Sequence, residues 1–174
     1  QDAGIEFVEL MGVQPNPTLE FIGVGIDLCR KENVDVIESY LKDIDVFSIN
    51  RHEAMLLYGL DDEAECERRL AAASPNWVFF RRGKDGAHML AKGVSYDCPS
   101  LKGISVVDTT GGGNSSSGAV LYACCEGYAP KMAGCMGSAA AAAILAQYGV
   151  PAQYTQAMRQ TAMKQAQSLC DEDK

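Results

Sequence analysis

Short apolar runs alternate with segments of helical periodicity along most of the chain. Continuous or β-branched runs typical of buried strands occupy 19–27, 44–49, 77–80, 87–91 and 104–107, and Gly93 is expected to start a turn into 94–96. Apolar residues recur at helical spacing in 35–41, 54–58, 63–73, 115–126, 130–147 and 155–170. Because strands and helices alternate, the pattern predicts an α/β fold, a three-layer αβα sandwich with a mostly parallel sheet.

Residues at the ends of the predicted helices support their boundaries. Asp61 is expected to be the N-cap of the helix at 63–73, and Thr155 that of the last helix. Gly59 is expected to end the helix at 54–58. No internal repeat or low-complexity linker divides the 174 residues, so we predict a single domain over residues 1–174.

Composition narrows the function classes. The chain is 47% hydrophobic and 22% charged, which allows a sizeable core. Its net charge of -8 argues against a nucleic acid or an anionic membrane as partner. The longest apolar run, Ser138–Ala146, is too short to span a membrane, and no signal peptide is visible. We therefore expect a cytoplasmic protein.

The seven cysteines form no CxxC pair, and the chain has only two histidines. A structural zinc site and a secreted disulfide framework are both disfavoured by this pattern. Buried, reduced thiols in a cytosolic protein are the expected state.

Three polar loops follow predicted strands, at Asn50–Glu53, Arg81–Gly86 and Asp108–Asn114. Ligands of α/β proteins bind outside the carboxyl ends of the parallel strands. Because all three loops occupy that position, the sequence predicts one shared binding site.

The glycines Gly111, Gly112 and Gly113 lie between a β-branched run and a helix. Their backbone can bend sharply, and the unpaired amides of the following helical turn can hold an anion such as phosphate. The alternative is a tight loop before a helix with a Ser-rich N-cap. A dinucleotide-binding oxidoreductase is disfavoured, because the Gly-x-Gly-x-x-Gly spacing is missing and the strand–turn unit comes late in the chain.

Together these loops resemble the ribokinase-like (PfkB) family of carbohydrate and nucleoside kinases. The family signature Asp-Thr-Thr-Gly-Ala-Gly-Asp is matched by Asp108–Asn114, and its Asn-x-x-Glu motif by Asn50–Glu53. A Gly-x-x-Gly turn after a strand is matched by Gly83–Gly86, and an alanine-rich helix before a glycine by Ser138–Ile144. Order and spacing agree from about residue 19 to 151.

The resemblance implies an ATP-dependent phosphotransferase that acts on a hydroxyl of a sugar or related small molecule. It implies ATP and Mg²⁺ as cofactors, allows a monovalent cation, and suggests a sugar or nucleoside substrate. Known members are considerably longer, and this chain resembles their C-terminal, nucleotide-binding half. We therefore expect a fragment of a longer kinase, and association into a homodimer is compatible with its exposed sheet edge.

The resemblance also assigns roles to residues. Gly111, Gly112 and Gly113 would form the anion hole, and Asn50 and Glu53 would hold Mg²⁺ through water. Further cofactor-binding residues would be Arg81, Gly83, Gly86, Asp108, Thr110 and Ser138, with Arg82 and Lys84 near the phosphates. The alternatives are a solvated first-turn acid for Glu53 and an ordinary charged turn for the basic residues.

Asn114 is the main departure from the family pattern, which places an Asp there as general base. An amide does not accept a proton at neutral pH, although it can hydrogen-bond a hydroxyl. Loss of a general base costs roughly 10²- to 10⁴-fold in rate, while electrostatic contributions remain. Two hypotheses follow: a kinase slowed by its altered base, or a catalytically weak relative that binds nucleotide or sugar in a regulatory or structural role.

Overall fold

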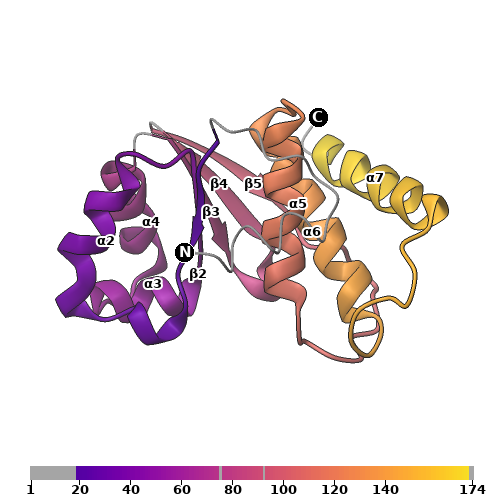
Figure 1. Ribbon diagram of the computed structural model, residues 1–174, viewed down its shortest axis with the longest axis horizontal. Helices are drawn as coiled ribbons and strands as arrows, with labels where there is room; N and C mark the ends of the chain where they lie inside the picture. The colour runs from indigo at the N-terminus through magenta and orange to yellow at the C-terminus, as the bar shows by residue number, and fades with distance from the viewer. Residues whose placement is uncertain (1–18, 75, 92, 173–174) are drawn as a thin grey trace.

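A five-stranded sheet with helices on both faces forms the body of the protein (Figure 1). The computed structural model describes residues 19–74, 76–91 and 93–172. The strands follow one another in the sheet in chain order: β1 (Phe21–Gly23), β2 (Val46–Asn50), β3 (Trp77–Arg81), β4 (Ala87–Ala91) and β5 (Val94–Cys98). The pairs β1–β2 and β2–β3 are parallel, and β4 is antiparallel to both neighbours. Four of the five strands therefore point the same way, as the mostly parallel prediction required.

Helices cover the two faces in two groups. One face carries α2 (Val34–Leu41), α3 (Arg51–Tyr58) and α4 (Glu63–Ala73). The other carries α5 (Gly112–Cys125), α6 (Pro130–Leu145) and α7 (Gln156–Asp171) (Figure 1). Short 3-10 helices occupy Ile26–Leu28, Lys31–Asn33 and Gly83–Asp85. The three-layer αβα arrangement predicted from the alternation is thus confirmed.

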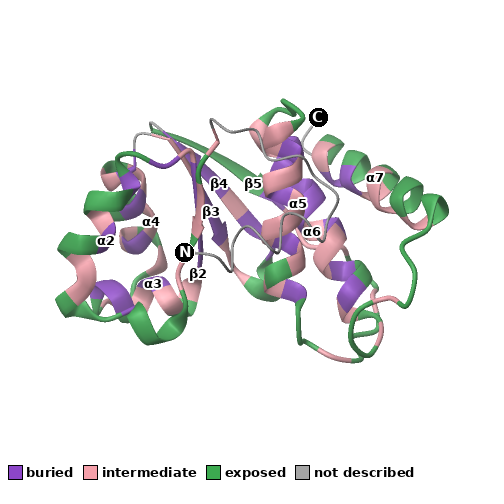
Figure 2. Ribbon diagram, viewed as in Figure 1, coloured by how far each residue is buried: buried purple, intermediate pink, exposed green. Residues whose placement is uncertain are grey.

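The side-chain alternation of a strand divides the core between the two faces. Val78 and Phe80 of β3 pack in the cluster under α2–α4, whereas Phe79 packs in the cluster under α5–α7. The central strands and the sheet-facing sides of the helices are buried, and the outer helix surfaces are exposed (Figure 2). The same alternation continues into Arg81 and Arg82, so their side chains lie on opposite faces of the sheet.

A close contact between α5 and α6 sets the position of the α5 amino end. A Cβ at Gly137 of α6 would press against Phe79 and Val120 and against the backbone oxygen of Ser116. Glycine is therefore required there for the two helices to approach. Ser117 of α5 and the buried Ser48 of β2 share a hydrogen bond of 2.8 Å between their hydroxyls, which fixes α5 over the end of the sheet.

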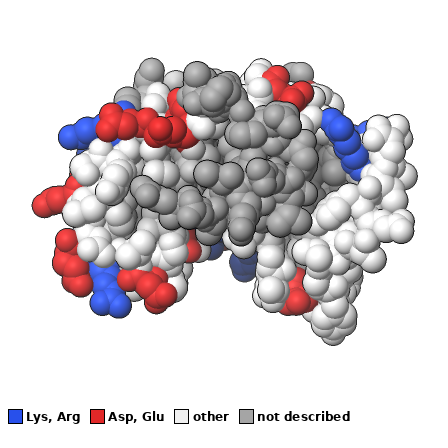
Figure 3. Space-filling view, in the orientation of Figure 1, with Lys and Arg blue, Asp and Glu red and all other residues white. Residues whose placement is uncertain are grey.

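The two helix groups differ in surface charge on the face drawn in Figure 3. Charged side chains of both signs gather over α2–α4, while the α6–α7 side is mostly uncharged. Among the described residues, no helix is long and apolar enough to cross a membrane.

Two boundary predictions were wrong. The first strand covers only Phe21–Gly23, because the chain turns into a 3-10 helix at Ile26–Leu28. The N-cap of α4 is Asp62, not Asp61, since the Asp62 Oδ1 accepts the Glu65 amide at 3.2 Å. Gly59 ends α3 in the left-handed conformation, and Thr155 caps α7, as predicted.

The run at 104–107 is not a strand. Val106 and Val107 are 53% and 40% exposed, and the Val107 amide donates to the Leu145 carbonyl of α6 at 2.8 Å. A β-branched run forms a strand only where a sheet edge and a buried surface are available to it. Here the segment instead crosses from β5 to α5 along the side of α6.

Candidate functional site

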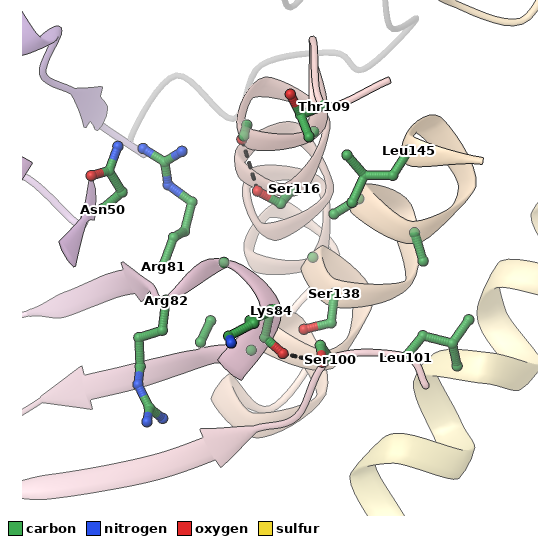
Figure 4. Close-up of a pocket in the computed structure, with 18 of the residues that line it drawn as sticks. Asn50, Arg81, Arg82, Lys84, Ser100, Leu101, Thr109, Ser116, Ser138 and Leu145 are labelled. Carbon is green, nitrogen blue, oxygen red and sulfur yellow. Dashed lines mark hydrogen bonds between the residues drawn. The ribbon is translucent and has the colours of Figure 1, made fainter. Parts of the chain in front are cut away.

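One cavity of about 600 Å³ lies at the carboxyl ends of β2 and β3 (Figure 4). Its wall includes residues from all three predicted loops. Of the predicted site residues, those that line it are Asn50, Arg81, Arg82, Gly83, Lys84, Gly86, Gly112, Gly113 and Ser138. Glu53, Asp108, Thr110, Gly111 and Asn114 lie in the same loops but outside this lining. The fold therefore brings the three loops together at one place.

Asn50 and Glu53 form a capping box at the start of α3. The Asn50 Oδ1 accepts the Glu53 amide at 2.9 Å, and the Glu53 Oε2 accepts the Asn50 amide at 2.8 Å. The Glu53 side chain is only 12% exposed, so it is not the solvated acid of the alternative interpretation. Its Oε1 has no hydrogen-bond partner in the part of the chain that the structure describes, and it remains available to a hydrated cation.

The glycine turn presents backbone amides at the α5 amino end. Gly111 has φ 84° and is the N-cap, without a side-chain cap. The first hydrogen bond within α5 runs from the Ser115 amide to the Gly111 carbonyl, at 2.9 Å. The amides of Gly113 and Asn114 precede it and therefore have no acceptor within the helix. The Ser-rich N-cap of the alternative interpretation is absent at this helix end. The Ser115 and Ser116 hydroxyls instead donate to the carbonyls of Gly111 and Gly113, at 2.8 and 2.7 Å.

Asp108 shapes the approach to this turn. Its Oδ1 accepts the Thr110 amide at 3.0 Å. Hydrogen bonds from the Thr110 amide and side chain lower the pKa of this exposed carboxyl. Asp108 and Thr110 therefore hold the turn that precedes the amino end of α5.

Arg81 reaches from the end of β3 to the first turn of α5. A Cβ at Gly113 would overlap its Nη1, so the guanidinium lies directly against that glycine (Figure 4). Its Nη2 is 3.4 Å from the Glu53 Oε2, and its Nε is buried without a hydrogen-bond partner among the described residues. Burial lowers the pKa of Arg81, and the Glu53 carboxylate acts in the opposite direction. A half-buried guanidinium with one long ion pair leaves positive charge at the cavity, so the site suits an added anion.

The Arg82 side chain points away from Arg81 and bonds to acidic residues and a histidine (Figure 4). Its Nε donates to the Glu63 Oε1 at 2.6 Å, and its Nη1 lies 2.7 Å from the His88 Nε2 and 3.5 Å from the Asp97 Oδ1. The His88 Nδ1 is in turn 2.6 Å from the Glu67 Oε1. The structure thus places the Arg82 side chain in a surface ion network, although the residue is one of those that line the cavity.

Apolar residues form a cavity wall that sequence analysis missed. They come from the segment between β5 and α5 and from the last turns of α6: Leu101, Ile104, Val106, Ala141, Ala142 and Leu145. The available signal was a run of apolar residues in a stretch without periodicity. Ser100 ties this segment to the Gly83–Gly86 turn, since its Oγ donates to the Lys84 carbonyl at 2.6 Å.

Asn114 follows the glycines in the first turn of α5 and is exposed. Its side chain makes no hydrogen bond to any described residue. Within the described ranges, no group of three or more His, Cys, Asp or Glu side chains is arranged to hold a metal ion. A divalent cation at this site would therefore depend on water and on ligand oxygens in addition to Glu53.

Comparison with known proteins assigns the family. The sequence profile described as pfkB family carbohydrate kinase matches residues 24–157, which is most of the chain. The chain belongs to the pfkB family. The predicted family resemblance is thereby confirmed, and the three loops at the cavity fall within the matched residues.

Solved structures of family kinases share the fold. A probable sugar kinase from Rhizobium etli CFN 42 is 26% identical, with a TM-score of 0.73, over 91% of this chain and 47% of that chain. An adenosine kinase from Sinorhizobium meliloti is 20% identical, with a TM-score of 0.72, over 91% and 48%. A ribokinase from Arabidopsis thaliana, complexed with ribose and ATP, is 20% identical, with a TM-score of 0.64, over 95% and 50%. The chain spans about half the length of these proteins.

Proposed function

We propose that this chain is the nucleotide-binding part of an ATP-dependent kinase that phosphorylates a hydroxyl of a sugar or nucleoside. The observation that carries the proposal is the cavity with two chemically different ends. One end has backbone amides and Arg81, and the other has an apolar wall. A nucleoside triphosphate has the same division between phosphates and base.

The phosphate end fits an anion by two features. The amides of Gly113 and Asn114 are in the first turn of α5 and have no acceptor within the helix. The helix dipole adds positive potential at this end. The Arg81 Nε is a buried donor that lacks an acceptor within the described residues. A phosphate oxygen would accept hydrogen bonds from these amides beside the Arg81 guanidinium, whose Nη1 lies against Gly113, and charge-assisted bonds of this kind are the stronger class.

The apolar end suits a flat heteroaromatic base. Ile104 and Val106 come from the segment before α5, and Leu145 comes from the end of α6. Apolar walls with a few polar groups are typical of small-molecule and cofactor sites. We place the adenine of ATP between these two walls.

Mg²⁺ fits the loop after β2 through oxygen ligands. The free Oε1 of Glu53 can accept a hydrogen bond from a water bound to the cation, while the capping box fixes the carboxylate. When bound, Mg²⁺ would neutralise charge on the transferring phosphoryl group.

The residues of this chain contribute position and charge to phosphoryl transfer. Arg81 and the α5 amides hold the phosphates and keep their orientation. Asn114 stands where a substrate hydroxyl would approach the same turn. Its amide can orient that hydroxyl but does not take its proton, so we expect slow turnover.

A second candidate function is nucleotide or sugar binding without significant catalysis. The exposed Asn114 at the base position favours it, because no side chain of Ser115, Ser116 or Ser117 supplies a carboxylate in its place. Both candidates require nucleotide binding at the α5 turn. They differ only in phosphoryl transfer.

The test has two stages. Calorimetric titration of this chain with a non-hydrolysable ATP analogue and Mg²⁺ should give saturable binding with one site per chain, and no binding would remove the proposal. ADP release by the complete protein, with a panel of sugars and nucleosides, then separates the candidates. Substrate-dependent ADP release identifies a kinase, and binding without release identifies the second candidate.

A further inference from the structure

The Gly83–Gly86 turn forms one wall of the cavity, between the end of β3 and the start of β4. Within the turn, the Arg82 amide donates to the Gly86 carbonyl at 2.8 Å. The two bonds of 3-10 type, from the Asp85 and Gly86 amides, are longer, at 3.3 and 3.1 Å. Such bonds have poorer geometry than those of an α-helix, so contacts from other elements matter for the position of this turn.

Arg51, the first residue of α3, bonds to two groups of this turn. Its Nη2 donates to the Arg82 carbonyl at 3.1 Å and to the Asp85 Oδ2 at 3.0 Å. The parallel register explains this reach, because Asn50 of β2 is paired with Arg81 of β3 and the next residues begin beside each other. The Arg51 guanidinium thus joins the loop after β2 to the loop after β3.

Glu63, the first residue of α4, fixes the Arg51 guanidinium. Its Oε2 accepts from the Arg51 Nη1 at 2.8 Å, and its Oε1 accepts from the Arg82 Nε at 2.6 Å. The side chains of Arg51 and Glu63 are 35% and 25% exposed, so solvent screens this pair only in part. A guanidinium is a planar fork of donors, and acceptors on Glu63, Asp85 and the Arg82 backbone therefore define its orientation.

The segment after β5 holds the same turn from another side. The Ser100 Oγ donates to the Lys84 carbonyl at 2.6 Å (Figure 4), and a Cβ at Gly86 would overlap the Cys98 carbonyl. The turn therefore lies between this segment and the amino ends of α3 and α4. Loss of the Arg51 side chain would remove the tie to the two helices and leave the tie to Ser100 in place.

We propose that Arg51 is a positioning residue for nucleotide binding, because its guanidinium holds the Gly83–Gly86 turn in the conformation that completes the cavity wall. This role rests on the proposed function, since it takes the cavity as the nucleotide site. Arg51 acts through its hydrogen bonds to the turn and not through its charge on the ligand. A residue that only stabilised the fold would leave affinity unchanged, and one that only attracted phosphate could be replaced by Lys.

The experiment compares Arg51→Met with Glu67→Met as a matched control. Glu67 lies outside the cavity lining, and its loss removes the 2.6 Å contact to His88 on the same face while the Arg51 bonds remain. Amide hydrogen exchange without nucleotide reports on the turn. Calorimetric titration with a non-hydrolysable ATP analogue and Mg²⁺ reports on binding.

In Arg51→Met, the amides of residues 82–86 should exchange about tenfold faster, and affinity should fall about tenfold. The amides of β2 and the first residues of β3 should stay protected, which shows that the variant is folded. Glu67→Met should lose stability through its broken contact but should change neither the exchange of the turn nor the affinity.

Arg51→Lys separates hydrogen-bond geometry from charge. An ammonium keeps the positive charge but lacks the planar fork, so it does not serve the same acceptors in the same arrangement. We expect fast exchange in the turn of Arg51→Lys and an affinity nearly as weak as that of Arg51→Met.

Three outcomes would overturn the inference. The first is unchanged exchange of the turn in Arg51→Met. The second is wild-type affinity in Arg51→Met, or an equal loss of affinity in Glu67→Met. The third is full recovery of affinity in Arg51→Lys. If the wild-type chain binds no nucleotide, the proposed function fails instead, and hydrogen exchange still decides whether Arg51 positions the turn.

Discussion

Arg81 and Arg82 are neighbours in the chain, yet their side chains lie on opposite faces of the sheet. Only Arg82 has its charge balanced by several close partners. Arg82 joins the α4 face, where Glu63 and Asp97 balance its charge and His88 contacts its Nη1. Arg81 joins the α5 face, where one long contact to Glu53 leaves its Nε without an acceptor in the described residues. Side-chain alternation at the end of β3 is the whole cause of this divergence.

The contrast teaches how a site can be separated from a surface network of similar composition. A structural ion network satisfies its own charges, so the α2–α4 face needs no ligand. The α5 face keeps buried donors and free amides together at a glycine turn, which folding alone does not explain. We infer that a bound phosphate completes this second set.

The largest effect is expected from Asn114→Asp in the complete protein. A carboxylate at this position would restore a general base, so phosphoryl transfer should rise by roughly 10²- to 10⁴-fold with little change in ATP affinity. Steady-state ADP release measures the change. A wild-type protein that turns over rapidly and is slowed by Asp would mean that Asn114 is not a substituted base.

Gly113→Val should have the next largest effect, on nucleotide binding. A side chain here displaces the Arg81 guanidinium and covers the first-turn amides, so affinity should fall by at least about 100-fold. Calorimetric titration with an ATP analogue measures the loss. Gly25→Val is the matched control, because no described atom lies within 4 Å of a Cβ there. Equal affinity in the two variants would remove the anion-site assignment.

Arg82→Met should affect stability and leave the site unchanged. It leaves Glu63 and Asp97 without their shared partner, so the free energy of unfolding should fall by about 1–2 kcal/mol. Urea unfolding measures this, with Arg30→Met as control because its pair with Glu32 is long and exposed. If Arg82→Met is as stable as Arg30→Met, the network on the α4 face contributes nothing to folding.

The smallest effect concerns the pH dependence of the same network. Burial raises the pKa of Glu63, but hydrogen bonds from Arg51 and Arg82 outweigh it and hold the pKa below the ordinary 4.5. The pair therefore stabilises the fold above pH 4.5, and that share is lost as the pH falls through the lowered pKa. Urea unfolding across this range should show a shallower acid loss in Glu63→Gln. Parallel curves would contradict the assignment.

The sequence predicted the three layers of the fold and the shared position of the three loops. It did not predict the path of residues 104–107 or the apolar wall of the cavity. The alternation of strands and helices can be recognised in the sequence. Because ligands bind at the carboxyl ends of parallel strands, it also predicts where the site lies. The fate of 104–107 was not predictable in this way, because a β-branched run needs a free sheet edge, and Val107 bonds to α6 instead. The apolar cavity wall was missed because Ile104 and Leu145 are far apart in the sequence and only the tertiary fold brings them to one cavity.

Arg81 and Arg82 look equivalent in the sequence, and only the register of β3 separates them. Strand register follows from the tertiary packing of Phe79 and Phe80. The local sequence does not show it, so both arginines were predicted to lie near the phosphates. The Asp62 cap shows the same limit on a smaller scale, because adjacent aspartates offer equal caps until the helix start is fixed.

The most direct measurement compares the ATP affinity of Arg81→Met and Arg82→Met in parallel calorimetric titrations with Mg²⁺. If the guanidinium at the α5 turn binds phosphate, Arg81→Met should weaken binding by about 10- to 100-fold, whereas Arg82→Met should stay within about twofold of wild type. Equal affinities for the two variants, or a larger loss in Arg82→Met, would contradict the division between a saturated face and a ligand-binding face.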